Sequence, residues 1–276
     1  MESTEYTTIA DGELEIVINT IASKYGYDFG QYAQASFKRR IIRILSRDRL
    51  SVSEFVNRLN IDPSYFADVL DEISVTVTEM LRDPSFYRVL KKEVLPVLAT
   101  YPLIRIWHAG CATGEEMYSM AILLYEAGIL HKSLLYGTDI NQVALHKARK
   151  GVFPLSQMQQ YSRNYIAAGG IKDFSSYYTA NYDAAQFSDF LSSRMVFSTH
   201  NLASDFSFNS FQLILCRNVM IYFNKHLQNK VLQLFDASLE PFGFLALGTK
   251  ETIRFSPIAS NYKQVVPNEK LWRRLT

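Results

Sequence analysis

The sequence predicts an α/β protein: an all-helical N-terminal domain, then a Rossmann-like domain that holds a small inserted β-subdomain. Before residue 74, apolar residues recur at helical spacing and no strand-like alternation occurs. From residue 101 onward, strand-like apolar runs alternate with helical stretches, which indicates a mainly parallel sheet. Between residues 161 and 193, many aromatic and small polar residues interrupt this alternation. We therefore expect a β-subdomain inserted at about 161–195.

Each part of the chain has its own predicted elements. Residues 1–75 form the helical domain, with helices at 13–23, 36–50, 53–59 and 65–73. Residues 76–100 form a linker with a helix from Pro84 to about residue 98, because proline is favourable in a first helical turn. Residues 101–276 form the α/β domain. Its strands are expected at 103–108, 134–137, 195–198, 211–216 and 244–247, with a closing hairpin of 262–266 and 270–274.

Composition and charge exclude several classes of protein. The chain has 276 residues, of which 48% are hydrophobic and 20% charged, as is ordinary for a globular protein. A net charge of +2 gives no strong attraction to nucleic acid, and no apolar run of about 18 residues predicts a membrane span. The polar, acidic start argues against a signal peptide, and two cysteines alone cannot form a disulfide framework or a zinc site. We expect a cytoplasmic monomer with no metal, no nucleic-acid partner and no membrane insertion.

Residues 103–141 predict a β-α-β unit that can hold a nucleoside. A strand-like run leads into the turn G-C-A-T-G-E-E at 110–116, a helix follows, and a second strand-like run ends at Asp139. The glycines let the backbone pass close to a ligand, and an acid at the end of the second strand can accept hydrogen bonds from ribose hydroxyls. Because the turn has two acids and no lysine, it favours a positively charged nucleoside without phosphates. S-Adenosylmethionine fits this description.

Asp139 has two possible roles. It lies 25 positions after Gly114, near the usual spacing of a ribose-binding acid. An acid at this position can instead cap the helix that begins nearby. The preceding glycine turn favours the ligand role.

A basic ridge lies on one predicted helix of the N-terminal domain. Arg39, Arg43 and Arg47 recur at steps of four residues, so their side chains share one helix face. This basic ridge is either the solvated face of a small domain or a docking surface for an acidic helical partner. Further cations on the same helix are Lys38, Arg40 and Arg49.

Four blocks of sequence resemble the CheR family of chemotaxis receptor methyltransferases. They are T-E-M-L-R-D-P at 78–84, G-C-A-T-G-E-E-M-Y-S at 110–119, H-N-L at 200–202 and C-R-N-V-M-I-Y-F at 216–223. The last block is highly specific, and the order and spacing of all four extend the resemblance over nearly the whole chain. The resemblance implies a helical N-terminal domain and a methyltransferase domain with an inserted β-subdomain, in agreement with the division above.

The resemblance also implies an activity and its residues. The family transfers the methyl group of S-adenosylmethionine to glutamate side chains on the cytoplasmic helical bundle of chemoreceptors, leaving glutamate methyl esters and S-adenosylhomocysteine. By resemblance, Arg82 and Tyr222 lie beside the transferred methyl group, and the basic ridge helps to dock the receptor. The cofactor-binding residues implied are Thr76, Thr78, Arg82, Gly110, Glu116, Asp139, Asn201, Leu202, Arg217 and Asn218.

The chain departs from the family pattern at several positions. Where the family often has N-x-T-x-F-F-R, this chain has T-V-T-E-M-L-R at 76–82. Threonine thus replaces asparagine at Thr76, and Met80 and Leu81 replace two phenylalanines. Met117 stands where proline is common. None of these changes removes an evident charge or glycine.

The expected reaction needs little acid–base chemistry. A glutamate side chain, with an ordinary pKa of about 4.3, is already an ionised nucleophile at neutral pH, so no general base is required. The site has to align the carboxylate with the methyl group, and an arginine or tyrosine suits this task. Two alternatives stay open. One is a small-molecule methyltransferase, and the other is a non-catalytic protein that binds the donor or its product and signals through protein contacts.

Overall fold

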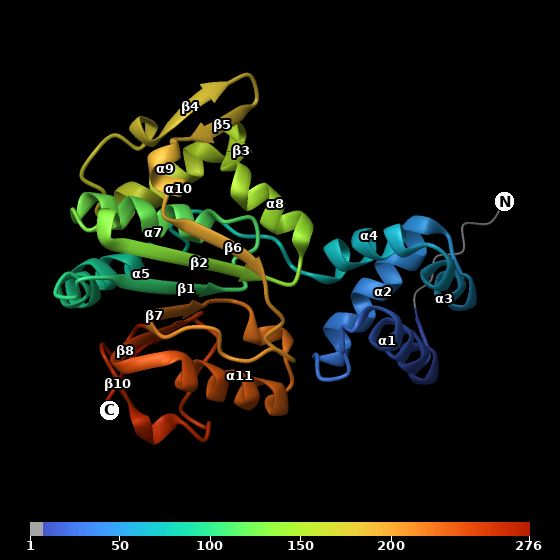
Figure 1. The fold of residues 1–276 in the computed structure, drawn as a ribbon. Coiled ribbons are helices and arrows are strands. Elements are labelled where there is room, and N and C mark those ends of the chain that lie inside the picture. The colour runs from blue at the N-terminus through green and yellow to red at the C-terminus, as the bar shows by residue number, and fades with distance from the viewer. Residues whose placement is uncertain (1–7) are drawn as a thin grey trace. The chain divides into compact units, whose positions relative to one another are not determined.

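The computed structural model describes residues 8–276, which divide into two compact units (Figure 1). The first unit comprises the chain up to Val75 together with Met220–Lys230. The second comprises Thr76–Val219 and Val231–Thr276. Within the described part of the chain, no helix is both long enough and apolar enough to cross a membrane.

Four helices make up most of the first unit: α1 (Asp11–Tyr25), α2 (Gln34–Asp48), α3 (Val52–Ile61) and α4 (Pro63–Ile73). Two of their starts are encoded locally. Ser51 caps α3 in a capping box with Glu54, and Asp62 caps α4 directly before Pro63. The helices bury apolar residues at helical spacing, including Val17, Ile21, Ile41, Ile44, Phe55, Leu59 and Val69. The predicted all-helical N-terminal domain is confirmed.

The second unit is built on a seven-stranded sheet of order β6-β2-β1-β7-β8-β10-β9. Its strands are β1 (Ile104–Ala109), β2 (Ser133–Asp139), β6 (Met195–Thr199), β7 (Phe211–Cys216), β8 (Leu239–Leu247), β9 (Tyr262–Gln264) and β10 (Leu271–Arg274). The first five strands in that order are parallel, and the predicted hairpin adds β10 and β9 as antiparallel strands. The parallel strands present their carboxyl ends at one edge of the sheet, where α/β proteins bind ligands.

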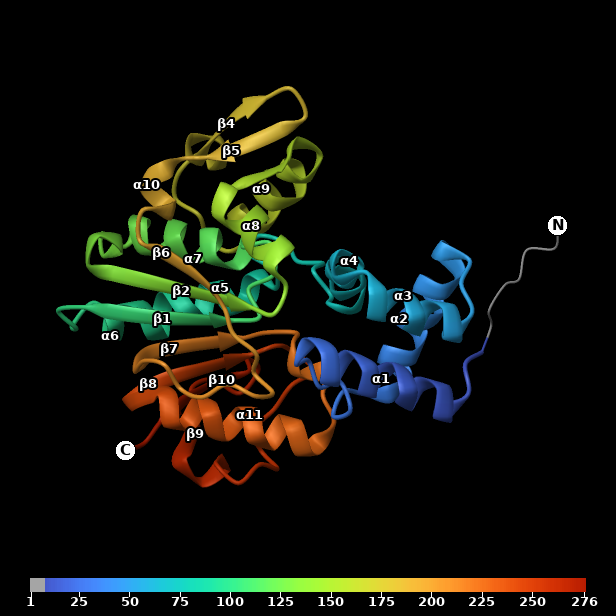
Figure 2. The same ribbon diagram turned by 45° about the vertical axis from the view of Figure 1, so that its right-hand side comes forward.

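Side chains along each strand point alternately to the two faces of the sheet. Helices pack on both faces. The helices are α7 (Glu115–Glu126), α8 (Gln142–Lys150) and the C-terminal part of α11 (Lys225–Ser238). On β1, His108 reaches α7, whereas the neighbouring Trp107 packs its ring 5.3 Å from that of Phe235 on α11. Figure 2 shows α7 lying along β2.

A separate three-stranded sheet of order β3-β5-β4 confirms the inserted β-subdomain. Its strands are β3 (Val152–Pro154), β4 (Tyr178–Asn181) and β5 (Ala184–Phe187), and its helices are α9 (Met158–Ala167) and α10 (Asp189–Ser192). The segment contains more helix than its aromatic content suggested. Tyr161 and Tyr165 are four residues apart and both buried, so they form a helix face. The limits of 161–195 stay a prediction, and the small sheet begins at Val152.

The expected linker helix is present but irregular. A π-helical turn, Leu90–Val94, separates α5 (Pro84–Val89) from α6 (Leu95–Leu98). Pro96 has no N–H to continue the usual hydrogen-bond ladder, and the wider turn directly before it takes up the mismatch.

Candidate functional site

The loop after β1 adopts a conformation that favours glycine. Gly110 and Gly114 have φ angles of 76° and 94°. A Cβ atom at Gly110 would lie 2.5 Å from Val219 Cγ2, so no larger residue fits there without a shift. The N–H of Gly110 donates to Thr138 O at 2.8 Å, which ties the loop to the end of β2. The backbone of this loop therefore packs closely against Val219 and the end of β2.

Asp139 ends β2 beside this loop. Its Oδ2 accepts a hydrogen bond from Ala112 N at 2.9 Å, and its Oδ1 accepts one from Asn141 N at 2.9 Å. Burial raises the pKa of Asp139, and these backbone hydrogen bonds oppose the rise. Each carboxylate oxygen has two lone pairs, so both can still accept from hydroxyls. The helix cap is Asn141 instead, whose side chain accepts from Ala144 N at 3.0 Å.

The end of β6 lies next to Asp139. The parallel register places Thr199 opposite Asp139, and His200 N donates to Asp139 O at 3.2 Å. Asn201 and Leu202 follow directly, the first half-buried and the second buried. The register therefore brings two of the predicted cofactor-binding residues close to the predicted ribose acceptor.

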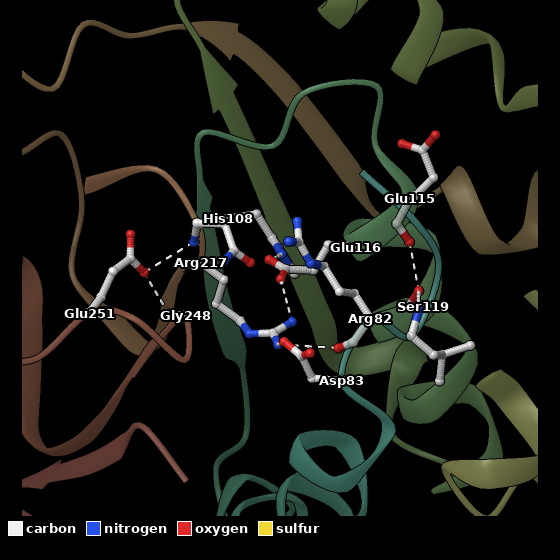
Figure 3. A network of polar contacts seen from close by, with 11 residues as sticks. Arg82, Asp83, His108, Glu115, Glu116, Ser119, Arg217, Gly248 and Glu251 are labelled. Atoms are coloured by element: carbon white, nitrogen blue, oxygen red, sulfur yellow. Dashed lines mark hydrogen bonds and ion pairs between the residues drawn. The ribbon is translucent and has the colours of Figure 1, made fainter. Parts of the chain in front are cut away.

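A buried arginine joins three parts of the second unit at the same edge (Figure 3). Arg217 directly follows β7, and its side chain is 3% exposed. Its guanidinium donates to Asp83 Oδ2 at 2.7 Å, to Arg82 O at 3.1 Å and to Glu116 Oε2 at 3.2 Å. It also lies 4.2 Å from the ring centroid of Phe86. Arg217 thus ties β7 to the start of α7 and to the turn before α5.

Both carboxylate oxygens of Glu116 have partners inside the protein. Oε1 lies 3.0 Å from His108 Nδ1, and Oε2 accepts from Arg217. Burial would raise the pKa of Glu116, but the hydrogen bond from His108 and the charge of Arg217 outweigh burial and lower it. An ionised carboxylate only accepts, so His108 Nδ1 carries the shared proton. Two buried nitrogens here, His108 Nε2 and Arg217 Nε, have no hydrogen-bond partner among residues 8–276.

The turn that carries Arg82 is strained. Leu81 and Asp83, on either side of it, have φ angles of 50° and 60°. Ser119 Oγ accepts from Leu81 N at 2.9 Å, and Arg217 holds the next two residues. Backbone strain of this kind costs about 1–3 kcal/mol per residue and is concentrated at functional sites. The contacts on both sides therefore fix the position of the Arg82 backbone, from which its side chain extends.

Comparison with known proteins identifies the family. A family model described as "CheR methyltransferase, SAM binding domain" matches residues 76–267, and one described as "CheR methyltransferase, all-alpha domain" matches residues 12–74. The chain belongs to the CheR methyltransferase family. It is 44% identical over 265 residues to Cher3 of Pseudomonas putida, covering 96% of this chain and 97% of that protein. It is 29% identical to the chemotaxis protein methyltransferase of Listeria monocytogenes, covering 83% of this chain and 85% of that protein.

S-Adenosylmethionine is therefore the methyl donor, and the carboxyl edge fits it. Gly110 lets this loop pack against Val219, where an added Cβ atom would lie 2.5 Å from Val219 Cγ2, so the path of the loop depends on glycine. Asp139 keeps lone pairs for ribose hydroxyls. Thr76 and Thr78 lie half-buried in the segment before the Arg82 turn, and Asn218 directly follows Arg217. Their contacts with the donor stay predictions.

Glu115 is a buried acid in the first turn of α7. It is 5% exposed, and its carboxylate accepts from Thr113 Oγ1 at 2.7 Å. Burial raises the pKa of Glu115 to about 7. Its main-chain oxygen accepts from Ser119 Oγ at 2.6 Å, and Ser119 in turn accepts from Leu81. The first turn of this CheR-family helix thus supports the Arg82 turn.

Glu251 is a further buried acid at this edge of the sheet. Its buried carboxylate accepts hydrogen bonds from the backbone of the turn after β7 (Figure 3). Glu251 belongs to none of the four family blocks, and an isolated acid in a loop forms no pattern that could have marked it.

Tyr222 lies in the first unit. Its main-chain oxygen accepts from Ala33 N at 2.7 Å, and the Arg40 guanidinium lies 5.8 Å from its ring centroid. The adjoining Phe223 forms an isolated antiparallel bridge with Tyr32. The helical domain therefore holds part of the signature block C-R-N-V-M-I-Y-F.

The basic ridge is exposed on α2. Arg43 pairs with Glu72 at 3.1 Å, and Arg47 pairs with its neighbour Asp48 at 2.7 Å. The side chains of Arg43 and Arg47 nevertheless stay 64% and 45% exposed. Arg39 is exposed as well, and all three ridge arginines are accessible in the first unit.

Proposed function

We propose that this methyltransferase methylates glutamate side chains on the cytoplasmic helical bundle of a chemoreceptor, producing glutamate methyl esters and S-adenosylhomocysteine. Relatives named chemotaxis protein methyltransferase cover 83% and 89% of the chain, which supports a receptor substrate. The Arg82 turn is the observation that carries the proposal. A half-buried arginine sits between two strained residues whose backbone and side chain are held by buried groups.

In this proposal, different residues of the second unit bind the acceptor carboxylate and the methyl donor. Arg82 orients the incoming carboxylate, because a guanidinium can hold both carboxylate oxygens. The acceptor glutamate is already ionised at neutral pH, so no residue has to remove a proton. S-Adenosylmethionine supplies an electrophilic methyl group whose transfer leaves a neutral thioether. The residues proposed to hold this donor are Thr76, Thr78, Arg82, Gly110, Glu116, Asp139, Asn201, Leu202, Arg217 and Asn218.

In this proposal, Glu116 and Arg217 also position the residues around them. Their pairing fixes the Arg82 turn, and both can still contact the donor, because each Glu116 oxygen keeps a lone pair and Arg217 Nε has no partner within residues 8–276. Tyr222 is assigned on the family pattern to contact the transferred methyl group. The basic ridge is assigned to dock the receptor, whose modified helices carry glutamates and therefore suit exposed arginines.

A labelling experiment tests this function. Protein incubated with methyl-labelled donor and a receptor cytoplasmic fragment should place base-labile label on the fragment, because methyl esters hydrolyse in base. Label that appears only on small molecules would contradict the receptor assignment. Donor binding without any transfer would indicate a non-catalytic protein.

Charge reversal of the basic ridge tests the docking part. Replacing Arg39, Arg43 and Arg47 by glutamate should lower receptor methylation at least tenfold and leave donor affinity within twofold. The matched control makes the same charge change at three exposed lysines, Lys92, Lys150 and Lys263. Equal loss in both triple variants, or loss of donor affinity in the ridge variant, would refute specific docking.

A further inference from the structure

Glu251 lies in the loop after β8, and its environment points to a role at the carboxyl edge. β7 and β8 are parallel neighbours whose last residues, Cys216 and Leu247, are opposite each other. The loops that follow them therefore leave the sheet side by side. Glu251 is 5% exposed, and its side chain reaches from the second loop back to the first (Figure 3).

Backbone donors converge on the carboxylate of Glu251. Oε2 accepts from Gly248 N at 2.5 Å and from Asn218 N at 3.0 Å, and Oε1 accepts from Val219 N at 3.0 Å. Hydrogen bonds to an ionised carboxylate are roughly twice as strong as neutral ones. They hold the backbone at Asn218, whose φ of 63° lies in the left-handed region that asparagine adopts more readily than most residues other than glycine.

The turn held by Glu251 touches two other parts of the site. Val219 packs so closely on Gly110 that an added Cβ atom there would lie 2.5 Å from it. Arg217, the residue before Asn218, binds the turn that carries Arg82. A shift of residues 217–219 would therefore move both the glycine loop and the arginine that fixes Arg82.

We propose that Glu251 is a positioning residue for the methyl-donor site. It sets the turn at 217–219 and, through that turn, the loop at Gly110 and the side chain of Arg217. This inference rests on the proposed donor site at the carboxyl edge. A glutamate that only stabilised the fold would change the free energy of unfolding without changing donor affinity, whereas a positioning residue changes both.

The test replaces Glu251 by glutamine in the full-length protein. Glutamine keeps the shape but offers one acceptor oxygen, and its NH2 group meets backbone N–H donors. Calorimetry should show S-adenosylmethionine and S-adenosylhomocysteine binding at least tenfold more weakly to E251Q. The amides of Asn218 and Val219 should also exchange hydrogen faster than in the wild type.

Glu126 provides a matched control. Its side chain is 2% exposed and accepts several hydrogen bonds, yet it lies at the far end of α7, about 16 Å from the first turn at 1.5 Å per residue. E126Q should lose thermal stability comparably and keep donor affinity within twofold. Donor affinity of folded E251Q within twofold of wild type, or an equal loss in E126Q, would overturn the proposal.

A second variant keeps the test decisive if E251Q does not fold. In G248A, the added Cβ atom would lie 2.7 Å from both Asn218 N and Glu251 Oε2, so it disturbs the same contacts without removing a charge. Donor affinity should fall at least fivefold, and unchanged affinity would count against the inference. If wild-type protein binds neither donor nor product, the donor site itself fails, and that result precedes any substitution.

Discussion

Helix α7 has a buried carboxylate network at each end, and the two differ in what surrounds them. At its first turn, Glu116 pairs with Arg217, and the adjoining backbone at Leu81 and Asp83 is strained. At its last turn, Glu126 accepts hydrogen bonds from Tyr165 and Tyr177 and pairs with Lys91 at 3.3 Å. We call these the first-turn network and the last-turn network.

The comparison separates two uses of buried charge. The last-turn network joins α7, α9 and the π-helical turn of the linker, so its acid connects elements of the core. The first-turn network connects loops that end at the carboxyl edge, and two of its buried nitrogens have no partner within residues 8–276. Strain and unsatisfied polar atoms are costly and persist mainly where function requires them. We therefore expect the two networks to respond differently when a matched residue is removed.

The largest expected difference comes from removing the cation of each network. Arg217→Met leaves Glu116 and Asp83 without their partner, and removing one member of a buried pair costs about 3–5 kcal/mol. Lys91→Met should cost roughly 1 kcal/mol, because Lys91 is 25% exposed and Glu126 keeps its tyrosine donors. Urea unfolding of both variants measures these free energies.

Donor affinity provides the second readout for this pair. R217M should bind S-adenosylmethionine at least tenfold more weakly, since the Arg82 turn loses its support, and K91M should bind it as wild type does. Equal unfolding costs together with equal donor affinities would remove the distinction between the two networks.

The next effect is a pH dependence that belongs to the first-turn network. The pKa of Glu115 is raised from 4.5 to about 7 in the folded protein by burial. The folded state therefore binds this proton more tightly than the unfolded chain, so the contribution of Glu115 to stability is full below pH 4.5 and is lost as pH rises through 7. A shift of about 2.5 units corresponds to about 3 kcal/mol at most.

Glu115→Gln mimics the protonated form and removes this dependence. Urea unfolding between pH 4.5 and 8 should show E115Q gaining stability relative to wild type as pH rises to about 7, with a constant difference above it. A difference that does not change across this range would show that folding does not raise the pKa of Glu115.

Some of this site could be predicted from the sequence because it depends on near neighbours. The glycine loop directly follows one strand and Asp139 ends the next, so each is marked by its own neighbours in the sequence, and the structure has both. The parallel sheet followed from alternating elements. The buried aromatic residues of α9 were harder, because Tyr161 and Tyr165 fit a helix face as well as an aromatic-rich strand.

The long-range pairs could not be predicted in this way. Glu116 and Arg217 are 101 residues apart, and the family resemblance assigned each to the donor without indicating that they pair with each other. Glu251 and Asn218 are 33 residues apart and share no motif. A linear pattern carries no information on which charge meets which, since that depends on strand order and loop path.

The smallest effect compares two glycines with the same backbone conformation. Gly110 and Gly169 have φ angles of 76° and 77°, so alanine at either pays roughly 1–2 kcal/mol for the left-handed conformation. At Gly169, beside the last-turn network, a Cβ atom meets nothing within 4 Å, whereas at Gly110 it would lie 2.5 Å from Val219 Cγ2. G110A should therefore cost roughly 1–3 kcal/mol more than G169A in the free energy of unfolding and should weaken donor binding, which G169A should leave unchanged. Thermal unfolding and calorimetry on both variants measure the two effects. Equal unfolding free energies and equal donor affinities for the two variants would mean that the loop after β1 can accommodate a Cβ atom and that its close packing has no part in holding the donor.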